Sequence, residues 1–151
     1  MVRVNIGIIG CGSISGLHAN GYLEHPNSSI VAICDTSKEV LRSRSEEWAV
    51  EKMYQDYRDL LSDPEVDAVD IITPHYLHSE MTIKSLEAGK HVSVQKPMAI
   101  TLAECKNMER ATMEASASFR VFENFKFYPP LQMAKTMLDN GEIGDPISIR
   151  M

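Results

Sequence analysis

The sequence lacks any long apolar run: no stretch of its 151 residues approaches the roughly 20 consecutive apolar residues that a membrane-spanning helix needs. It is also short of positive charge, with 15 Lys and Arg against 21 Asp and Glu and a formal net charge of −6. Such a balance is a poor match for a nucleic-acid backbone, whose binding relies on Lys and Arg. We therefore expect neither a membrane nor a nucleic acid as partner.

Cysteine is scarce, and its spacing fits neither of its common structural uses. The chain has Cys11, Cys34 and Cys105, an odd number with no C-x-x-C pair, which argues against a disulfide framework and against a zinc site. We expect no metal. The N-terminus carries Arg3 and then a strand pattern rather than a secretory signal, so a cytoplasmic location is expected. Cys11 and Cys34, near the ends of adjacent strands, are expected to be two buried, reduced thiols.

Apolar runs rich in Ile and Val alternate with amphipathic helical patterns along one domain-sized chain. Strands are predicted at 3–9, 29–34, 67–72, 91–95 and 119–122, with a short one around Met53. Helices are predicted at 13–24, 37–49, 76–88, 101–116 and 130–140, with a single turn at 56–61. Thr101 and Glu104 form a capping-box pattern. This alternation predicts a single α/β domain with a doubly wound parallel sheet.

Three glycines mark the turn between the first predicted strand and the first predicted helix. Gly10 can adopt the positive φ of a tight turn, and Gly12 lacks the Cβ that would keep a pyrophosphate from the backbone. The third expected glycine falls at Ser15, a small residue, with Gly16 one place later. Asp35 ends the second strand, where a carboxylate can accept hydrogen bonds from a ribose diol. The pattern predicts a dinucleotide site; a glycine-rich turn without a ligand is the alternative.

Polar clusters follow the later strands at 73–78, 95–97 and 123–126, where a doubly wound sheet places its ligands. Residue types alone do not decide whether each cluster has a functional or a structural role, since Pro74 suits a helix start and His78 suits a helix surface. Lys96 is the strongest candidate because it follows a buried strand and precedes Pro97, which stiffens the turn. A lysine amine there would face the cofactor cleft and could move a proton.

Taken in order, residues 7–15, His18, Asp35, 73–78, 88–92 and 95–97 resemble one family over essentially the whole chain. It is the glucose–fructose oxidoreductase, inositol dehydrogenase and MocA-type family of NAD(P)-dependent oxidoreductases. The resemblance implies a Rossmann-type fold, NAD as cofactor with NADP left open, and Lys96 as catalytic residue. It implies that the cofactor-binding residues are Gly10, Gly12, Ser13, Ile14, Asp35, Thr36, Ser37, Thr73, Pro74, His78, Gln95, Lys96 and Asn124.

The chain departs from the family pattern at three positions that bear on substrate class. Gln95 replaces the usual Glu, His75 stands where Asn is common, and Lys126 stands where Arg is common. Family members also carry a second α/β domain, which supplies most substrate contacts, and the chain ends where that domain would begin. We expect a dinucleotide-binding domain at 1–122, a connecting segment with a helix packing on it at 123–144, and the start of a truncated substrate domain at 145–151.

The function implied is the NAD(P)-binding domain of an oxidoreductase that transfers hydride between nicotinamide and a sugar, polyol or related alcohol. Its small-molecule substrate would bind to the full-length protein, and a homo-oligomer is compatible with the family. A non-catalytic NAD(P)-binding sensor is the alternative, and an adenosylmethionine-dependent methyltransferase is a third reading. NAD is preferred because Asp35 repels a 2′-phosphate, although Thr36, Ser37 and Lys38 could hold one. Without the second domain, we predict an exposed apolar patch and a tendency to associate.

Overall fold

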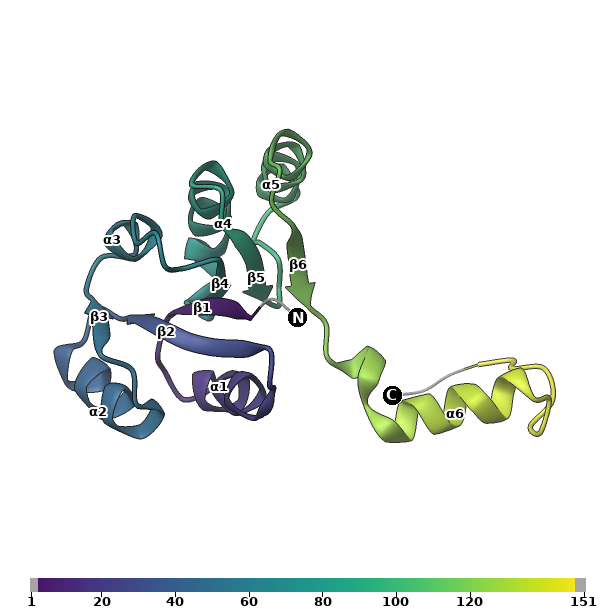
Figure 1. Cartoon of the computed structure of the whole chain (residues 1–151). Helices are drawn as coiled ribbons and strands as arrows, with labels where there is room; N and C mark the ends of the chain where they lie inside the picture. Colours follow the sequence, from purple (N-terminus) through teal and green to yellow (C-terminus); the bar gives the residue numbers. More distant parts are fainter. Residues whose placement is uncertain (1–2, 149–151) are drawn as a thin grey trace.

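A computed structural model describes residues 3–148, which form one six-stranded sheet with helices on both faces (Figure 1). The strands are β1 (Val4–Ile9), β2 (Ser28–Cys34), β3 (Lys52–Tyr54), β4 (Ala68–Ile71), β5 (His91–Gln95) and β6 (Phe119–Phe122). Their order across the sheet is β3-β2-β1-β4-β5-β6, and every neighbouring pair is parallel. The predicted parallel α/β sheet is confirmed.

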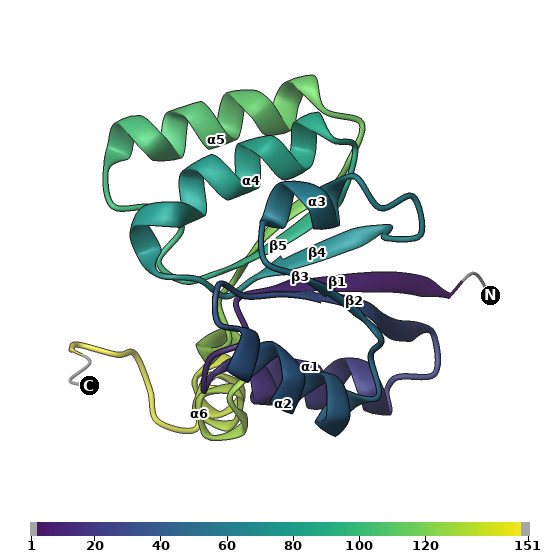
Figure 2. The ribbon, with the colours of Figure 1, turned by 90° about the vertical axis from the view of Figure 1, so that its left-hand side faces the viewer.

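The helices cover the sheet from two sides, as a doubly wound fold requires. They are α1 (Ser15–Glu24), α2 (Lys38–Trp48), α3 (Tyr57–Leu61), α4 (His78–Glu87), α5 (Leu102–Glu114) and α6 (Pro129–Asp139), with 3₁₀ turns η1 (His75–Leu77) and η2 (Phe125–Phe127). In Figure 2, α1 and α2 lie below the sheet, whereas α3, α4 and α5 lie above it. The β1–β4 boundary is where the chain reverses its direction across the sheet, and ligands bind at such switch points.

Two apolar clusters fill the space between the sheet and its helices. One joins Ile8 and Ile33 to Leu41 and Trp48 on the α2 side. The other joins strand residues such as Ile71 to the helices on the opposite face. The central strands are buried on both faces, which accounts for their nearly continuous runs of Ile and Val.

Polar caps determine where several helices begin. Ser37 accepts a hydrogen bond from the Val40 amide at the start of α2, and Asp56 accepts one from Arg58 at the start of α3. At α5, Thr101 and Glu104 form the predicted capping box in full. These side chains satisfy amide groups that a helix start leaves unpaired.

The structure differs from the sequence-based expectation at three places. The first helix begins at Ser15 rather than residue 13 because Ser13 and Ile14 belong to the glycine turn. The helix predicted at 76–88 is divided into η1 and α4. The third difference is α6, which was expected to pack on the domain: it has no buried residue and extends away from the sheet (Figure 1).

The end of the chain bears on the strand-like pattern at 147–151. Residues 147 and 148 form no strand, and residues 149–151 lie outside the described part.

None of the helices between residues 3 and 148 combines the length and apolar character that a membrane crossing needs.

Candidate functional site

The glycine turn begins at Gly10, which only glycine can occupy without strain. Its φ is +93°, and a Cβ there would stand 2.5 Å from the carbonyl oxygen of Ile72. The Gly10 amide donates to the carbonyl of Cys34 at 2.8 Å, which ties the turn to the end of β2. The chain is thus directed across the top of the sheet between β2 and β4.

The backbone opens at Gly12, just before α1. No atom lies within 4 Å of the place where a Gly12 Cβ would stand. Ile14, at the N-cap, makes no side-chain capping bond, and no acidic residue lies in the first turn. The Ser15 and Leu17 amides donate to the carbonyls of Gly12 and Ile14, but no side chain covers the start of α1, so the positive dipole end of this ten-residue helix remains available to an anion.

Ser15 takes the position where the fingerprint has its third glycine. Its side chain is fully buried, and its hydroxyl donates to the carbonyl of Gly12. A serine is therefore accommodated between helix and sheet while it bonds the turn it follows. The imperfect motif still gives the closed turn of the fingerprint.

Asp35 is fixed beside the glycine turn by two backbone amides. Its Oδ2 accepts from the Cys11 amide at 2.9 Å, and its Oδ1 accepts from the Ser37 amide at 2.9 Å. Burial raises the pKa of Cys11 to about 12, and the charge of Asp35 acts in the same direction. Cys11 is therefore a neutral thiol in the wall of the turn.

Arg44 on α2 donates hydrogen bonds to the same turn, a role that no sequence pattern predicted. Its Nε donates to the Cys11 carbonyl and its Nη2 to the Gly12 carbonyl, both at 3.3 Å. Its guanidinium lies 5.2 Å from the centre of the Trp48 ring. The contact depends on how α2 packs, which no local pattern reveals.

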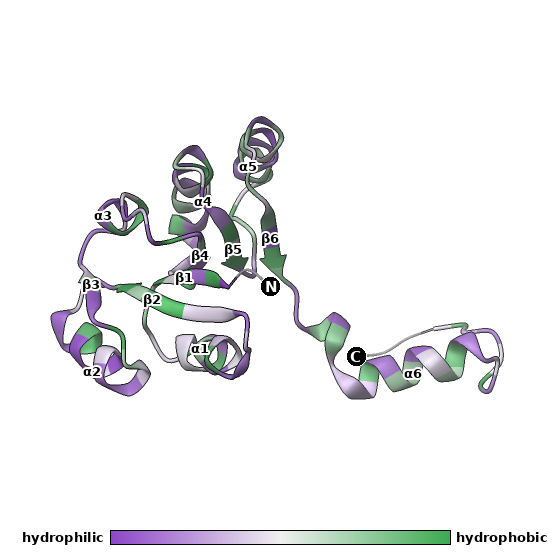
Figure 3. Cartoon of the chain, in the orientation of Figure 1, coloured by the Kyte–Doolittle hydropathy of each residue, from purple (hydrophilic) through white to green (hydrophobic). Residues whose placement is uncertain are grey.

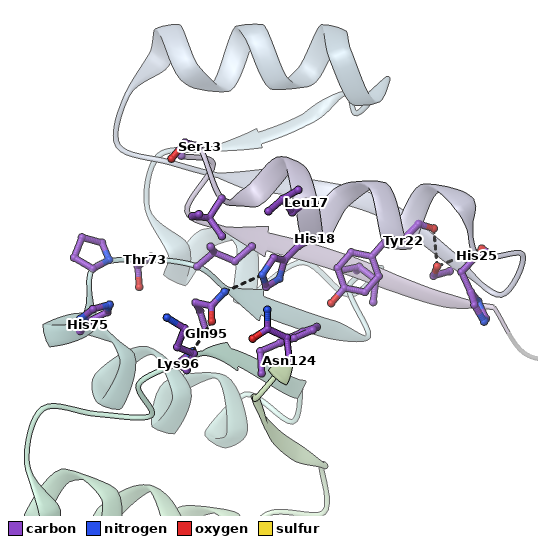
Figure 4. Close-up of a pocket in the computed structure, with 18 of the residues that line it drawn as sticks. Ser13, Leu17, His18, Tyr22, His25, Thr73, His75, Gln95, Lys96 and Asn124 are labelled. Atoms are coloured by element: carbon purple, nitrogen blue, oxygen red, sulfur yellow. Dashed lines mark hydrogen bonds between the residues drawn. The ribbon is translucent and has the colours of Figure 1, made fainter. Parts of the chain in front are cut away.

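A pocket of about 1110 Å³ extends from the glycine turn along α1 to the carboxyl ends of β4, β5 and β6 (Figure 4). Most predicted site residues line it: Gly12, Ser13, Ile14, Thr73, Pro74, Gln95, Lys96 and Asn124. Figure 4 shows Gln95 pointing from β5 toward His18, with Lys96 and Asn124 close by. Residues far apart in sequence are thus brought to one cavity of a volume suited to a large cofactor.

The remaining predicted residues do not line the pocket. Gly10, Asp35, Thr36 and Ser37 lie on the β2 side of the glycine turn, and His78 lies behind the wall. Thirteen further lining residues were not predicted as site residues, among them the four side chains Leu17, His18, Tyr22 and Phe122. Helical spacing could have found three of them, because positions 14, 18 and 22 of one helix share a face and position 17 adjoins it.

His78 is fully buried and joins two turns of the pocket. Its Nδ1 lies 2.8 Å from the carbonyl oxygen of Pro97, and its Nε2 lies 2.9 Å from that of Thr73. The ring therefore holds the turn after β4 against the turn after β5. This placement gives His78 a supporting position rather than one on the pocket surface.

A buried carboxylate lies beneath the pocket floor. Asp70 on β4 is fully buried, and its Oδ2 is 2.8 Å from His18 Nδ1 and 3.0 Å from the Tyr22 hydroxyl. Burial raises the pKa of Tyr22, and the charge of Asp70 raises it further, so the phenol remains a donor. His18 Nε2 then faces the side-chain nitrogen of Gln95 at 3.0 Å.

Metal binding finds no support in the described residues. Between residues 3 and 148, no three His, Cys, Asp or Glu side chains are grouped so that they could hold an ion. The open glycine turn, the free start of α1 and the pocket beyond it define the site of a dinucleotide-binding α/β domain. The chain belongs to the oxidoreductase family with an NAD-binding Rossmann fold of the Gfo/Idh/MocA type, whose family model matches residues 4–123.

Curated relatives extend the similarity beyond the residues of the family model. The chain is 36% identical over 144 residues to the uncharacterized oxidoreductase YrbE of Bacillus subtilis, covering 95% of this chain and 42% of that protein. It is 34% identical over 148 residues to the myo-inositol 2-dehydrogenase of Thermotoga maritima, covering 98% and 44%. The chain thus spans less than half the length of these relatives.

Solved structures show the same fold with different nicotinamide cofactors. The scyllo-inositol dehydrogenase of Lactobacillus casei, with bound NAD(H) and scyllo-inositol, superposes with a TM-score of 0.88 at 26% identity, covering 95% of this chain and 43% of that one. A variant of the 3-ketoreductase KijD10 of Actinomadura kijaniata, in complex with TDP-benzene and NADP, gives 0.88 at 26% identity, covering 95% and 46%. Proteins of this family therefore bind NAD or NADP.

Proposed function

We propose that this chain binds NAD(H) as the cofactor domain of a dehydrogenase acting on a sugar, polyol or related alcohol. The observation that carries the proposal is the alignment of the open Gly12 backbone and the uncapped start of α1 with the pocket that holds Lys96. The pyrophosphate would lie on the helix N-terminus, which places the nicotinamide toward the ends of β4 and β5. When bound, the nicotinamide supplies hydride transfer.

Asp35 supports NAD over NADP. Its two oxygens accept from the Cys11 and Ser37 amides, so the carboxylate cannot turn away without leaving both donors unpaired. A fixed negative charge at this place bonds a free ribose diol and repels a 2′-phosphate. Thr36 and Ser37 would lie beside that ribose.

Lys96 is the residue we assign to proton transfer at the substrate hydroxyl. It is exposed on the pocket wall and follows β5 directly. An ammonium there would donate to, or stabilise charge on, an alcohol oxygen whose carbon exchanges hydride with the cofactor. The pocket already contains Thr73 and Asn124, which can orient such a polar substrate. The sugar or polyol class itself rests on what the relatives act on.

A paired fluorescence titration with NADH and NADPH tests the cofactor assignment. We expect saturable NADH binding and weaker NADPH binding by the natural chain. Asp35→Ser should weaken NADH binding by roughly tenfold and narrow or reverse the preference. Glu46→Ala, on the exposed surface of α2, serves as the control and should change neither. Failure to bind either nucleotide, or binding of adenosylmethionine in their place, would contradict the proposal.

A further inference from the structure

We infer that Asp70, His18 and Gln95 form one hydrogen-bond chain with a single direction, which holds His18 as the neutral Nδ1–H tautomer and positions Lys96. The part of this inference that concerns Lys96 rests on the function proposed above. The geometry of the chain stands independently of that function.

The buried end of the chain determines the proton on one ring nitrogen of His18. Asp70 is fully buried. Its Oδ2 accepts a hydrogen bond from the Tyr22 hydroxyl and lies 2.8 Å from His18 Nδ1. A carboxylate oxygen only accepts, so a bare Nδ1 at 2.8 Å would place two lone pairs against each other. Nδ1 therefore carries a hydrogen and donates it to Asp70.

The exposed end of the chain determines the other ring nitrogen. The Lys96 amide lies 2.7 Å from Oε1 of Gln95, which identifies that atom as the accepting oxygen. The side-chain NH₂ of Gln95 must then be the group 3.0 Å from His18 Nε2. Because NH₂ only donates, Nε2 has to accept with its lone pair, and the imidazole is neutral.

All donors in the chain therefore point the same way, from the Lys96 amide through Gln95 and His18 to Asp70. The His18 ring is also packed against Phe122, with ring centroids 4.6 Å apart, so it has little freedom to rotate. A buried anion thereby fixes the backbone from which Lys96 extends into the pocket. His18, Gln95 and Asp70 act as positioning residues.

The identity of residue 95 is what keeps His18 neutral in this scheme. A glutamate at that position would accept from the Lys96 amide with one oxygen and present the other oxygen to Nε2. Nε2 would then need a hydrogen, and the ring would become an imidazolium between two carboxylates. Gln95→Glu should thus add one proton to the His18 ring while it preserves the shape of the side chain at position 95.

Long-range ¹H–¹⁵N NMR of the histidine rings tests the chain of hydrogen bonds directly. The His18 signals are assigned by their disappearance in His18→Gln. We expect one protonated and one bare ring nitrogen in the natural chain near neutral pH, with Nδ1 protonated. Gln95→Glu should move the Nε2 resonance to the protonated position, whereas Leu23→Ala on the exposed side of α1 should leave it unchanged. An Nε2–H tautomer, or a Gln95→Glu spectrum identical to that of the natural chain, would overturn the inference.

The effect on Lys96 is measured by ¹³C reductive methylation, with its signal identified by loss in Lys96→Arg. Gln95→Glu should shift the Lys96 signal, and Leu23→Ala should not. An unchanged Lys96 signal in Gln95→Glu, although His18 has gained its proton, would refute the positioning role. If His18 and Lys96 behave as expected while NADH fails to bind, the proposed function is wrong and the chain of hydrogen bonds stands.

Discussion

At the scale of single residues, Gly10 and Gly12 need glycine for different reasons. Gly10 needs it for the fold, because a Cβ would meet the Ile72 carbonyl at 2.5 Å and its φ is positive. Gly12 has open space and no positive φ, so its small size serves whatever approaches from outside. We predict that Gly10→Ala lowers the free energy of unfolding by about 2 kcal/mol or more, and Gly12→Ala by less than about 0.5 kcal/mol.

Urea denaturation of the two glycine variants checks this contrast. Gly12→Ala should nevertheless weaken NADH binding, because the added methyl group occupies the space beside the backbone that we assign to the pyrophosphate. Equal losses of stability in both variants would contradict the distinction.

The thiols give a second prediction at the residue scale. Burial raises the pKa of both Cys11 and Cys34 to about 12, so neither forms much of the reactive thiolate at ordinary pH. Cys105 is only partly buried. At about pH 8, iodoacetamide should label Cys105 alone in the native chain and all three cysteines after denaturation, as read by mass spectrometry. Rapid native labelling of Cys11 would show that the turn opens.

At the scale of elements, every strand was predicted from the sequence, because each is a short run of residues that favour β-strands and differs in composition from its surroundings. The ends of the elements were harder to predict than their existence, because the ends depend on tertiary contacts. One helix was expected over 76–88, but residues 75–77 form η1 before α4 begins at His78, whose ring bonds two carbonyls. The exposed position of α6 could not be predicted either, because an amphipathic pattern shows an apolar face without showing what covers it.

The candidate site likewise has features that could be predicted from the sequence and features that only the structure reveals. The glycine spacing and Asp35 are local signals, and the structure brings them together within one turn. His18 and Asp70, by contrast, are 52 positions apart and meet only because α1 packs beneath β4. The family resemblance included His18 in its motif but assigned it no role. A contact of this kind becomes visible only with the packing.

Asp63 links two elements and gives a prediction for stability. It accepts from Lys52 and Tyr54 at the edge strand β3 and from the Glu65 amide before β4. We predict that Asp63→Ala lowers the free energy of unfolding by about 1–3 kcal/mol, because the Tyr54 hydroxyl and the Glu65 amide lose their acceptor and Lys52 keeps only the Glu65 carboxylate. Urea denaturation checks this, with Glu46→Ala as an exposed control that should change stability by less than about 0.5 kcal/mol.

The same carboxylate gives the pH dependence of this effect. The Lys52 ammonium and the Glu65 amide hold the pKa of Asp63 below its ordinary value. Its contribution is therefore fully present above the unfolded-state value of about 4 and decreases as pH falls through the lower folded-state value. The stability difference between the natural chain and Asp63→Ala should accordingly shrink on acidification. A difference that stays constant down to about pH 2 would contradict this account.

At the scale of the whole molecule, the sheet and its five helices form one packed body, from which η2 and α6 project (Figure 1). Hydrophobic and hydrophilic positions alternate along α6, as Figure 3 shows. The segment exposes large apolar side chains at Phe125, Phe127, Tyr128, Leu131, Met133, Met137 and Ile143. Apolar surface gathered in this way marks a place of contact, which agrees with the exposed patch expected from the sequence.

We therefore predict that the 151-residue chain associates in a concentration-dependent way through η2 and α6. Sedimentation velocity over a hundredfold range of concentration should show the weight-average mass rising above that of a monomer. Leu131→Glu combined with Met137→Glu should shift the distribution toward monomer, because charge on this face opposes burial. Leu102→Glu, at an exposed apolar position on α5, is the control and should leave association unchanged. A chain that stays monomeric throughout, or one that Leu102→Glu dissociates just as well, would show that the projecting segment is not the contact surface.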